Sequence, residues 1–344
     1  MKLATLKDGT RDGQLAIVSR DLESAHLADG IAPTLQAALD DWAFIAPQLN
    51  EIYQQLNNGD GNGNGNGSGR GRGRRAFEFD PKNCMAPLPR AFQRVDACAY
   101  LNHAQLVRRA FGAALPANFQ EQPLMCQGAG DDWLGPCDDI VLAHEAWGID
   151  FNAELAVITD DLPMGSTPDQ AQGHIKLLML VNGLALRNLM PDEAANGYGC
   201  LESRPASSCS PLALTPDELG AAWKDGKVVS ALRLSWNGKL VGQPEAGVGM
   251  AFNFPQLLSH LSKTRNARAG TIVCSGAVSN QDASRGYACI AERRALEMLA
   301  DGVASTPFML FQDRIKIEML GLDGKSMFGA IDQLVKQSAP RKPG

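Results

Sequence analysis

Four segments of the sequence place acidic, basic, thiol or imidazole side chains inside otherwise apolar runs. The first contains Asp96 and His103, the second contains Cys126, and the other two contain Glu154 and Arg187. Imidazoles and carboxylates transfer protons at neutral pH, and carboxylates also bind hard divalent cations. These segments are therefore the candidates for a catalytic or cation-binding site.

Two other chemistry-bearing patterns are absent from the sequence. No Gly-rich motif of the dinucleotide-binding or P-loop type occurs, so a nucleotide cradle has no support. The eight cysteines include no CxxC pair, which argues against a structural zinc site because zinc ligands usually come as close pairs. In a reducing compartment such cysteines are mostly small buried hydrophobic residues.

Together and in this order, the four segments resemble the fumarylacetoacetate hydrolase family. The matching stretches are 96–103 (DACAYLNH), 123–128 (PLMCQG), 149–158 (IDFNAELAVI), 180–188 (LVNGLALRN), 269–276 (AGTIVCSG) and 313–318 (DRIKIE). The N-terminal hairpin is similar to the bacterial branch of that family. The resemblance implies an α+β fold, in which a mixed β-sandwich roll carries peripheral helices and a small N-terminal region.

The resemblance also implies a type of reaction. Members of the family typically cleave a carbon–carbon bond in a 1,3-diketo acid, or decarboxylate or isomerise related oxo acids. A divalent cation chelates the oxo and enol oxygens of the substrate, and a histidine beside the chelate activates water or moves a proton. The expected partner is a small oxo-acid-like molecule, and a homodimer is expected because family members are commonly dimers.

The catalytic residues implied by the resemblance are His103, Glu292 and Arg187. His103 follows Asp96 by the seven residues that separate the family's first metal carboxylate from its histidine. The alternative for His103 is a structural histidine at a helix start. Glu292 is the nearest match to the acidic partner that fixes the tautomer of the imidazole. Arg187 matches the arginine of the family's Asn-Asp-x-Ser-x-Arg motif.

The implied metal ligands are Asp96, Asn152 and Glu154, and they depart from the family pattern. The family's Glu-x-Glu motif is Asn152-Ala153-Glu154 in this sequence. Gly183 stands where the family has its fourth metal-binding carboxylate. Asp150 shares the strand face of Asn152 and is a candidate substitute. Two opposite unit charges about 4 Å apart attract each other by roughly 4 kcal/mol at an effective dielectric constant of about 20, and a dication doubles this attraction. Mg²⁺ or another divalent cation is therefore expected to bind weakly or not at all.

The same resemblance implies a set of substrate contacts. Cys126 replaces the tyrosine of the family's Tyr-x-Gly turn, and Arg204 and Ser208 replace a Lys and a Thr near the metal's water shell. Arg108 and Arg109 either contact a substrate carboxylate or form a solvated helix face. The full expected set is Cys126, Gln127, Arg108, Arg109, Arg204, Ser208 and Thr271.

Three functional hypotheses follow. The first is a hydrolase or lyase of an oxo acid or 1,3-dicarbonyl compound with a weakened cation site. The second is a repurposed family member of a specialised pathway, which uses His103 for metal-independent acid–base chemistry. A variant of the second makes Cys126 a nucleophile. The third is a non-catalytic binding protein on the same fold.

Apolar periodicity predicts the elements that position these residues. Residues 1–20 predict a hairpin, and residues 34–56 predict a helix interrupted near Pro47. Strands are expected over 153–158, 228–235, 271–274 and 314–320, with a two-residue turn at 237–238. Further helices are expected over 103–111, 168–189, 255–263 and 289–299, and after an N-cap at Thr215.

The stretch 57–75 divides the chain. It has almost no apolar residues and is expected to be a flexible Gly/Asn/Arg-rich loop, the alternative being a nucleic-acid contact through its arginines. It separates an N-terminal region (1–56) from a family-like catalytic domain (76–335), which a tail (336–344) follows.

The composition limits the partners. The chain of 344 residues has a net charge of −6, which argues against general nucleic-acid or anionic-membrane binding. It has no apolar run of about 18 residues or more and no signal-peptide pattern. A cytoplasmic protein without membrane contact is expected.

Overall fold

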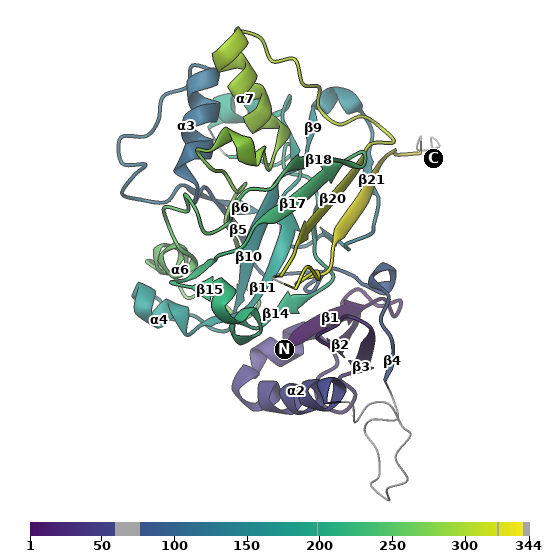
Figure 1. Cartoon of the computed structure of the whole chain (residues 1–344). Helices are drawn as coiled ribbons and strands as arrows, with labels where there is room; N and C mark the ends of the chain where they lie inside the picture. The colour runs from purple at the N-terminus through teal and green to yellow at the C-terminus, as the bar shows by residue number, and fades with distance from the viewer. Residues whose placement is uncertain (59–75, 198, 322, 340–344) are drawn as a thin grey trace, which may run out of the picture.

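The large sheet of the molecule is built from strands of both halves of the chain (Figure 1). The computed structural model describes residues 1–58, 76–197, 199–321 and 323–339, and within these ranges the sheet has 12 strands. They are β1 (Lys2–Leu6), β2 (Gln14–Val18), β3 (Ser24–Leu27), β4 (Phe77–Glu78), β5 (Arg94–Ala97), β6 (Met125–Gly128), β7 (Trp133–Leu134), β10 (Ala153–Thr159), β11 (Ile175–Asn182), β13 (Ser207–Cys209), β14 (Ala213–Leu214) and β19 (Ile272–Cys274). The main path runs β4-β3-β2-β1-β14-β11-β10-β19-β5-β6, and β13 pairs with β11 and β7.

A second sheet packs over one face of the first (Figure 1). In spatial order its strands are β18 (Lys239–Gly242), β17 (Leu232–Trp236), β20 (Arg314–Met319), β21 (Ile331–Gln337) and β8 (Ile140–Leu142). Two short pairs are formed by β9 (Ile149–Asp150) with β12 (Ala185–Leu186), and by β15 (Trp223–Lys224) with β16 (Lys227–Val228). Asn237 and Gly238 join β17 to β18, and both have the positive φ that this hairpin turn requires.

Helices lie around the two sheets (Figure 1). The α-helices are α1 (Leu35–Asp40), α2 (Trp42–Asn57), α3 (Leu101–Ala110), α4 (Pro168–Gln172), α5 (Met190–Asn196), α6 (Phe254–Leu261) and α7 (Ile290–Asp301). Short 3₁₀ helices are η2 (Pro81–Asn83), η3 (Glu145–Trp147), η4 (Pro216–Ala222) and η5 (Ala283–Arg285). Helix α3 packs beside α7 at the end of the molecule away from the N-terminal strands.

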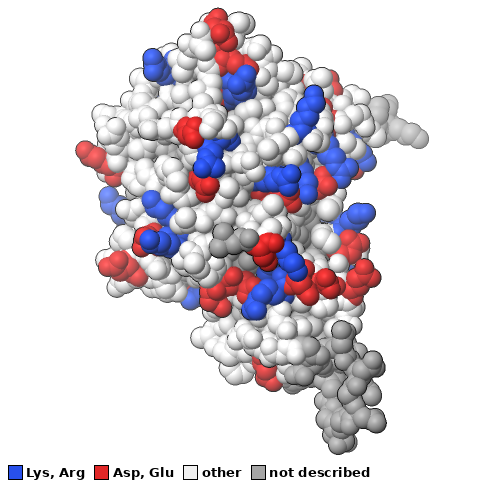
Figure 2. All heavy atoms as spheres, in the orientation of Figure 1, with Lys and Arg blue, Asp and Glu red and all other residues white. Residues whose placement is uncertain are grey.

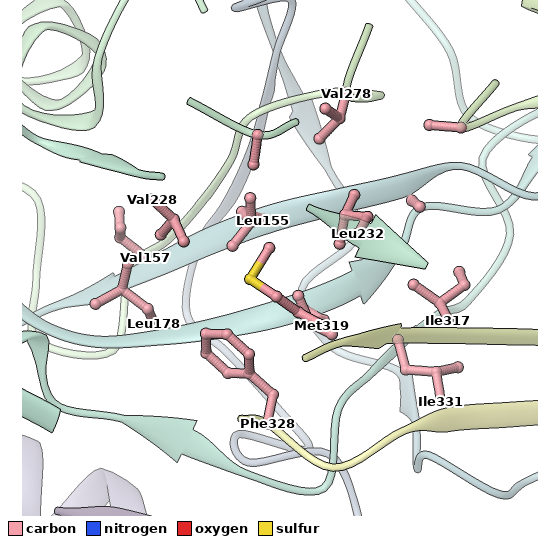
Figure 3. Close-up of a cluster of buried hydrophobic side chains, with 14 of the residues drawn as sticks. Leu155, Val157, Leu178, Val228, Leu232, Val278, Ile317, Met319, Phe328 and Ile331 are labelled. Atoms are coloured by element: carbon pink, nitrogen blue, oxygen red, sulfur yellow. The ribbon is translucent and has the colours of Figure 1, made fainter. Parts of the chain in front are cut away.

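Strand β10 contributes to two separate hydrophobic clusters, one on each face. Leu155 belongs to the cluster that also contains Leu232 of β17 and Ile317 of β20 (Figure 3). Ala156 belongs to the other cluster, which includes apolar residues of α1 and α2. Because successive side chains of a strand alternate faces, Glu154 lies on the same face as Ala156.

The fold class and most predicted elements are confirmed. The predicted hairpin is β1–β2, and the strands predicted over 153–158, 271–274 and 314–320 are β10, β19 and β20. The helices predicted over 103–111, 255–263 and 289–299 are α3, α6 and α7. The strand predicted over 228–235 is divided, because β16 ends at Val228 and β17 begins at Leu232.

Two helix predictions are wrong in part. The helix predicted over 34–56 breaks at Asp41, whose φ of −137° and ψ of 51° are not helical, whereas Pro47 lies inside α2. The helix predicted over 168–189 ends at Gln172, and the following apolar run forms β11. A run buried on both faces has no alternation that marks it as a strand. Thr215 precedes η4 without a side-chain cap bond.

The N-terminal region continues the main sheet, since β1 pairs with β2 on one side and β14 on the other. Residues 59–75, which contain most of the predicted loop, and residues 340–344 of the predicted tail lie outside the described residues. The proposed domain division therefore stays a prediction. Among the helices of the described ranges, none combines the length and apolarity that a membrane crossing requires.

Candidate active site

An imidazole–carboxylate pair lies where α3 packs against α7. His103 Nδ1 is 3.1 Å from Glu292 Oε2. The His103 side chain is 16% exposed, whereas Glu292 is buried. A carboxylate accepts the Nδ1 proton, and the neutral imidazole then keeps the Nε2 lone pair. The pair can therefore act as an oriented base through Nε2.

Further hydrogen bonds fix the carboxylate of this pair. Ser279 Oγ donates to Glu292 Oε1 at 3.0 Å, and Asn102 Nδ2 donates to Ser279 Oγ at 2.8 Å. Both oxygens of Glu292 are thus held. Sequence reasoning missed Ser279, because it lies in a loop after β19 with no motif of its own and only the fold brings it to α7.

The start of α7 is held by Asp150. Its Oδ1 accepts from the Ile290 N–H at 2.6 Å, and its Oδ2 accepts from the Ala291 N–H at 3.1 Å. Arg187 Nε also donates to Asp150 Oδ2 at 2.8 Å. Asp150 therefore caps the helix that carries Glu292, and both of its oxygens are engaged with protein donors. Arg187 is held in the same network, and its catalytic role stays a prediction.

Asn152, an expected metal ligand, is engaged with protein groups. Its Nδ2 donates to Gly183 O at 2.6 Å, and its Oδ1 accepts from Arg187 Nη2 at 3.0 Å. A Cβ on Gly183 would lie 2.4 Å from Glu154 Oε1. The Glu154 carboxylate thus fills the space in which a side chain at position 183 would begin.

Asp96 and Glu154 do converge, together with Cys274. One potential ligand atom of each lies within 4.8 Å of the others, and all three residues are buried. Asp96 Oδ1, however, accepts a hydrogen bond from Arg94 Nε at 2.8 Å. Sequence reasoning missed Arg94, although its position two residues before Asp96 on one strand places both side chains on the same face.

Burial raises the pKa of Glu154 well above its usual value, and the neighbouring Asp96 charge adds to this effect. The arginines Arg94 and Arg204 act in the opposite direction. Burial likewise raises the pKa of Cys98 to about 11, with Glu154 as the next cause. The carboxylate and thiol in this part of the site are therefore held towards their protonated forms.

The residues present do not fit a resident Mg²⁺. This ion requires near-octahedral oxygen coordination, usually with several waters. Asp96 already pairs with a guanidinium, the Asn152 amide is engaged, and Gly183 offers no side chain. A second group of potential ligands consists of His103, Cys289 and Glu292. There the imidazole and carboxylate bond to each other, and burial raises the pKa of the Cys289 thiol.

The carboxylate cluster and the imidazole pair are linked through Gly276. Its N–H donates to Glu154 Oε2 at 3.2 Å. A Cβ at this position would lie 2.2 Å from Ala97 O, and its φ is +77°. Glycine therefore allows the backbone at position 276, whose N–H binds Glu154, to pack directly against the segment that leads from Asp96 to His103.

Two expected substrate contacts, Cys126 and Arg204, lie near the cluster. Cys126 is exposed on β6, in register with Asp96 of β5. Gln127 pairs with Val95, so strand alternation places its side chain on the opposite face. Arg204 acts electrostatically on the Cys126 thiol, whose pKa is raised chiefly by desolvation from the surrounding protein, although the residue is solvent-accessible, and then by Asp96. These residues can contact a ligand that enters beside β6.

The other expected contacts have partners elsewhere. Arg108 Nη1 donates to Ala114 O at 2.5 Å, although its charge still acts on Cys98. Ser208 Oγ donates to a glutamine of β21 at 2.5 Å, and Thr271 Oγ1 donates to a backbone carbonyl at 2.7 Å. Arg109 is exposed in the last turn of α3. Their roles in substrate binding stay predictions.

Comparisons with known proteins agree with this architecture. Residues 1–90 match the family model described as Fumarylacetoacetase N-terminal domain 2, and residues 94–335 match Fumarylacetoacetate (FAA) hydrolase C-terminal. A search of curated protein sequences found no match. Maleylpyruvate hydrolase from Sphingobium sp. SYK-6, in complex with manganese (II) ion and pyruvate, is 13% identical with a TM-score of 0.63 over 98% of this chain and 100% of that one.

A second solved structure is similar at the same level. The 5-carboxymethyl-2-hydroxymuconate delta-isomerase from Mycobacterium smegmatis is 13% identical, with a TM-score of 0.58 over 98% of this chain and 100% of that one. At such low identity these two likenesses establish the fold alone.

Proposed function

The chain belongs to the fumarylacetoacetate hydrolase family, and on this premise we propose that it is an enzyme of oxo acids or 1,3-dicarbonyl compounds. The reaction is carbon–carbon bond hydrolysis or the related lyase chemistry, with His103 as the acid–base residue. One observation carries the proposal: His103 Nδ1 lies 3.1 Å from Glu292 Oε2. The other oxygen of this carboxylate, Oε1, accepts a hydrogen bond from Ser279 Oγ.

In the proposed reaction, His103 and Glu292 have separate tasks. His103 Nε2 removes a proton from water as the water oxygen adds to the carbonyl carbon. The carbon–carbon bond then breaks to give a carboxylic acid and an enolate, and the imidazolium returns the proton to the enolate carbon. Glu292 stabilises the imidazolium that forms and keeps the ring in one orientation. The family supplies the substrate class, which the names of the two structural neighbours also support.

The test is a comparison of matched histidine variants with acylpyruvates as substrates. The wild-type protein is expected to cleave an acylpyruvate, with the loss of its enol absorbance as the readout. His103→Ala should lower kcat/KM by roughly 100-fold or more, the usual contribution of a positioned acid–base group. Glu292→Gln should lower it less and shift the pH profile, because the imidazolium loses its counter-charge.

His260→Ala provides the control, since His260 lies on α6 away from the α3–α7 contact. It should leave kcat/KM close to the wild-type value. Full activity in the His103→Ala variant would contradict the assignment.

A further inference from the structure

A guanidinium lies among the carboxylates of the site. The Arg94 side chain is 2% exposed, and its Nε donates to Asp96 Oδ1 at 2.8 Å. Its Nη1 donates to Ser207 Oγ at 2.8 Å, and its Cζ lies 4.6 Å from the centre of the Trp133 ring. The remaining amino group, Nη2, is buried and has no hydrogen-bond partner among the described residues. Arg94 is thus held rigidly with one donor unused.

The unused groups of the cluster are mainly donors. Arg94 Nη2, Arg204 Nε and Asp96 Oδ2 are buried and have no hydrogen-bond partner among the described residues. A buried polar group without a partner is costly, so such atoms mark the place of a water or a ligand. Two cationic donors and one carboxylate oxygen favour an oxygen anion as the ligand and disfavour a metal ion.

The charges of the cluster also disfavour a metal ion as the ligand. Asp96 and Glu154 are the acidic groups, and Arg94 and Arg204 both act on Glu154 as cations. The acidic charge is therefore matched by arginine, and a dication would meet the Arg94 guanidinium at Asp96. A Cβ on Gly128 would lie 2.9 Å from Asp96 Oδ2 and 3.0 Å from Arg94 Nε, so glycine allows β6 to pack directly on this ion pair.

We propose that Arg94 is the built-in cation of this site. Together with Arg204 it binds the carboxylate or enolate oxygens of the oxo acid, a task for which a divalent ion would otherwise be needed. Arg94 Nη2 and Arg204 Nε supply the hydrogen bonds, and Asp96 and Ser207 orient the guanidinium. The substrate class rests on the proposed function, whereas the anion site itself rests on the geometry.

The binding test uses oxalate, a dianion with the shape of an oxo-acid enolate, and chelator-treated full-length protein. Calorimetry should detect oxalate binding to the wild type in the presence of chelator. Arg94→Met should weaken this binding by about tenfold or more, the equivalent of roughly 1.4 kcal/mol. Arg11→Met, at the exposed β1–β2 turn, is the matched control and should bind like the wild type.

Arg94→Met leaves Asp96 buried without a counter-charge, which can unfold the protein. The double variant Arg94→Met/Asp96→Asn removes both charges, and it should fold, as judged by circular dichroism, yet show the same weakened binding. Wild-type affinity in either folded variant would overturn the proposal. So would oxalate binding that appears in the wild type only after Mn²⁺ is added.

A metal titration gives an independent check. Electron paramagnetic resonance of Mn²⁺ should show no bound ion in the wild-type protein at submillimolar metal. Stoichiometric Mn²⁺ binding that Asp96→Asn abolishes would overturn the proposal, because Asp96 would then be a metal ligand.

Failure of the anion site can be distinguished from failure of the proposed reaction, because oxalate binding requires no proton transfer. His103→Ala should retain oxalate binding. If acylpyruvates are not cleaved but oxalate binding still depends on Arg94, the reaction assignment fails and the anion site stands. If cleavage depends on His103 but chelator-treated protein does not bind oxalate, the anion site fails and the reaction assignment stands.

Discussion

At the scale of residues, the site has two parts with different tasks. His103 and Glu292 form the proton-transfer pair of the proposed reaction, and Arg94 with Asp96 forms an ion pair within the carboxylate cluster. Glu154 belongs to the same cluster as Asp96 and accepts a hydrogen bond from the Gly276 N–H. Proton transfer and the handling of substrate charge are therefore assigned to separate side chains.

The pKa of Cys126 gives a prediction at this scale. Desolvation by the surrounding protein and the Asp96 charge raise this pKa, so a smaller fraction of the thiol is ionised at a given pH than for a free cysteine. Alkylation of Cys126 by iodoacetamide should therefore be slower than that of glutathione at pH 7, and its rate should keep rising to a higher pH than that of glutathione. Mass spectrometry of the Cys126 peptide over a pH series measures the rate.

Alkylation at pH 7 that is faster than that of glutathione would show a stabilised thiolate. It would restore the hypothesis that Cys126 is a nucleophile.

Part of this site was predictable from the sequence. Asp96 and His103 belong to one short segment, so their spacing can be read from the sequence without knowledge of the fold. Glu292 lies in the N-terminal turn of a helix that the apolar pattern predicts. Arg94 was missed, although the strand rule that relates residues i and i+2 would have placed it beside Asp96. The bonds of Ser279 and Asp150 could not be predicted, because they join elements far apart in the sequence.

At the scale of elements, the position of α7 depends on its N-terminal cap. Asp150 is fully buried, accepts two backbone N–H bonds of α7 and neutralises Arg187. Cysteine 289 precedes the helix without a side-chain cap bond. Asp150 is therefore the main link between the sheet and the helix that carries Glu292.

Asp150→Ala should destabilise the protein by roughly 3–5 kcal/mol, because it leaves Arg187 buried without its counter-charge and removes a helix cap. Denaturant unfolding measures this loss. Asp301→Ala, an exposed residue at the other end of α7, is the control and should change stability by less than about 0.5 kcal/mol. A loss of similar size in both variants would mean that Asp150 has no special role.

The wrong element predictions have a physical cause. The residues of β11 from Leu177 to Asn182 are all buried, since the strand lies between β10 and β14 with a hydrophobic cluster on each face. Such a strand lacks the alternation of polar and apolar residues that distinguishes it from a buried helix. Strand β10 was predicted correctly because β-branched residues and a short length favoured a strand.

At the scale of the whole molecule, one sheet joins the N-terminal region to the site-bearing part. Lys2 pairs with Leu214 in the contact of β1 with β14, and β11, β10 and β19 then lead to the strand that carries Arg94 and Asp96. The face shown in Figure 2 carries basic and acidic side chains interspersed over its surface. The homodimer, the cytoplasmic location and the absence of a nucleic-acid partner stay predictions.

The most direct test of the account is a crystal structure of the chelator-treated protein with oxalate. Oxalate oxygens are expected within hydrogen-bond distance of Arg94 Nη2 and Arg204 Nε, with Arg94 still paired with Asp96. A metal ion coordinated by Asp96 and Glu154, with Arg94 displaced from Asp96, would contradict it.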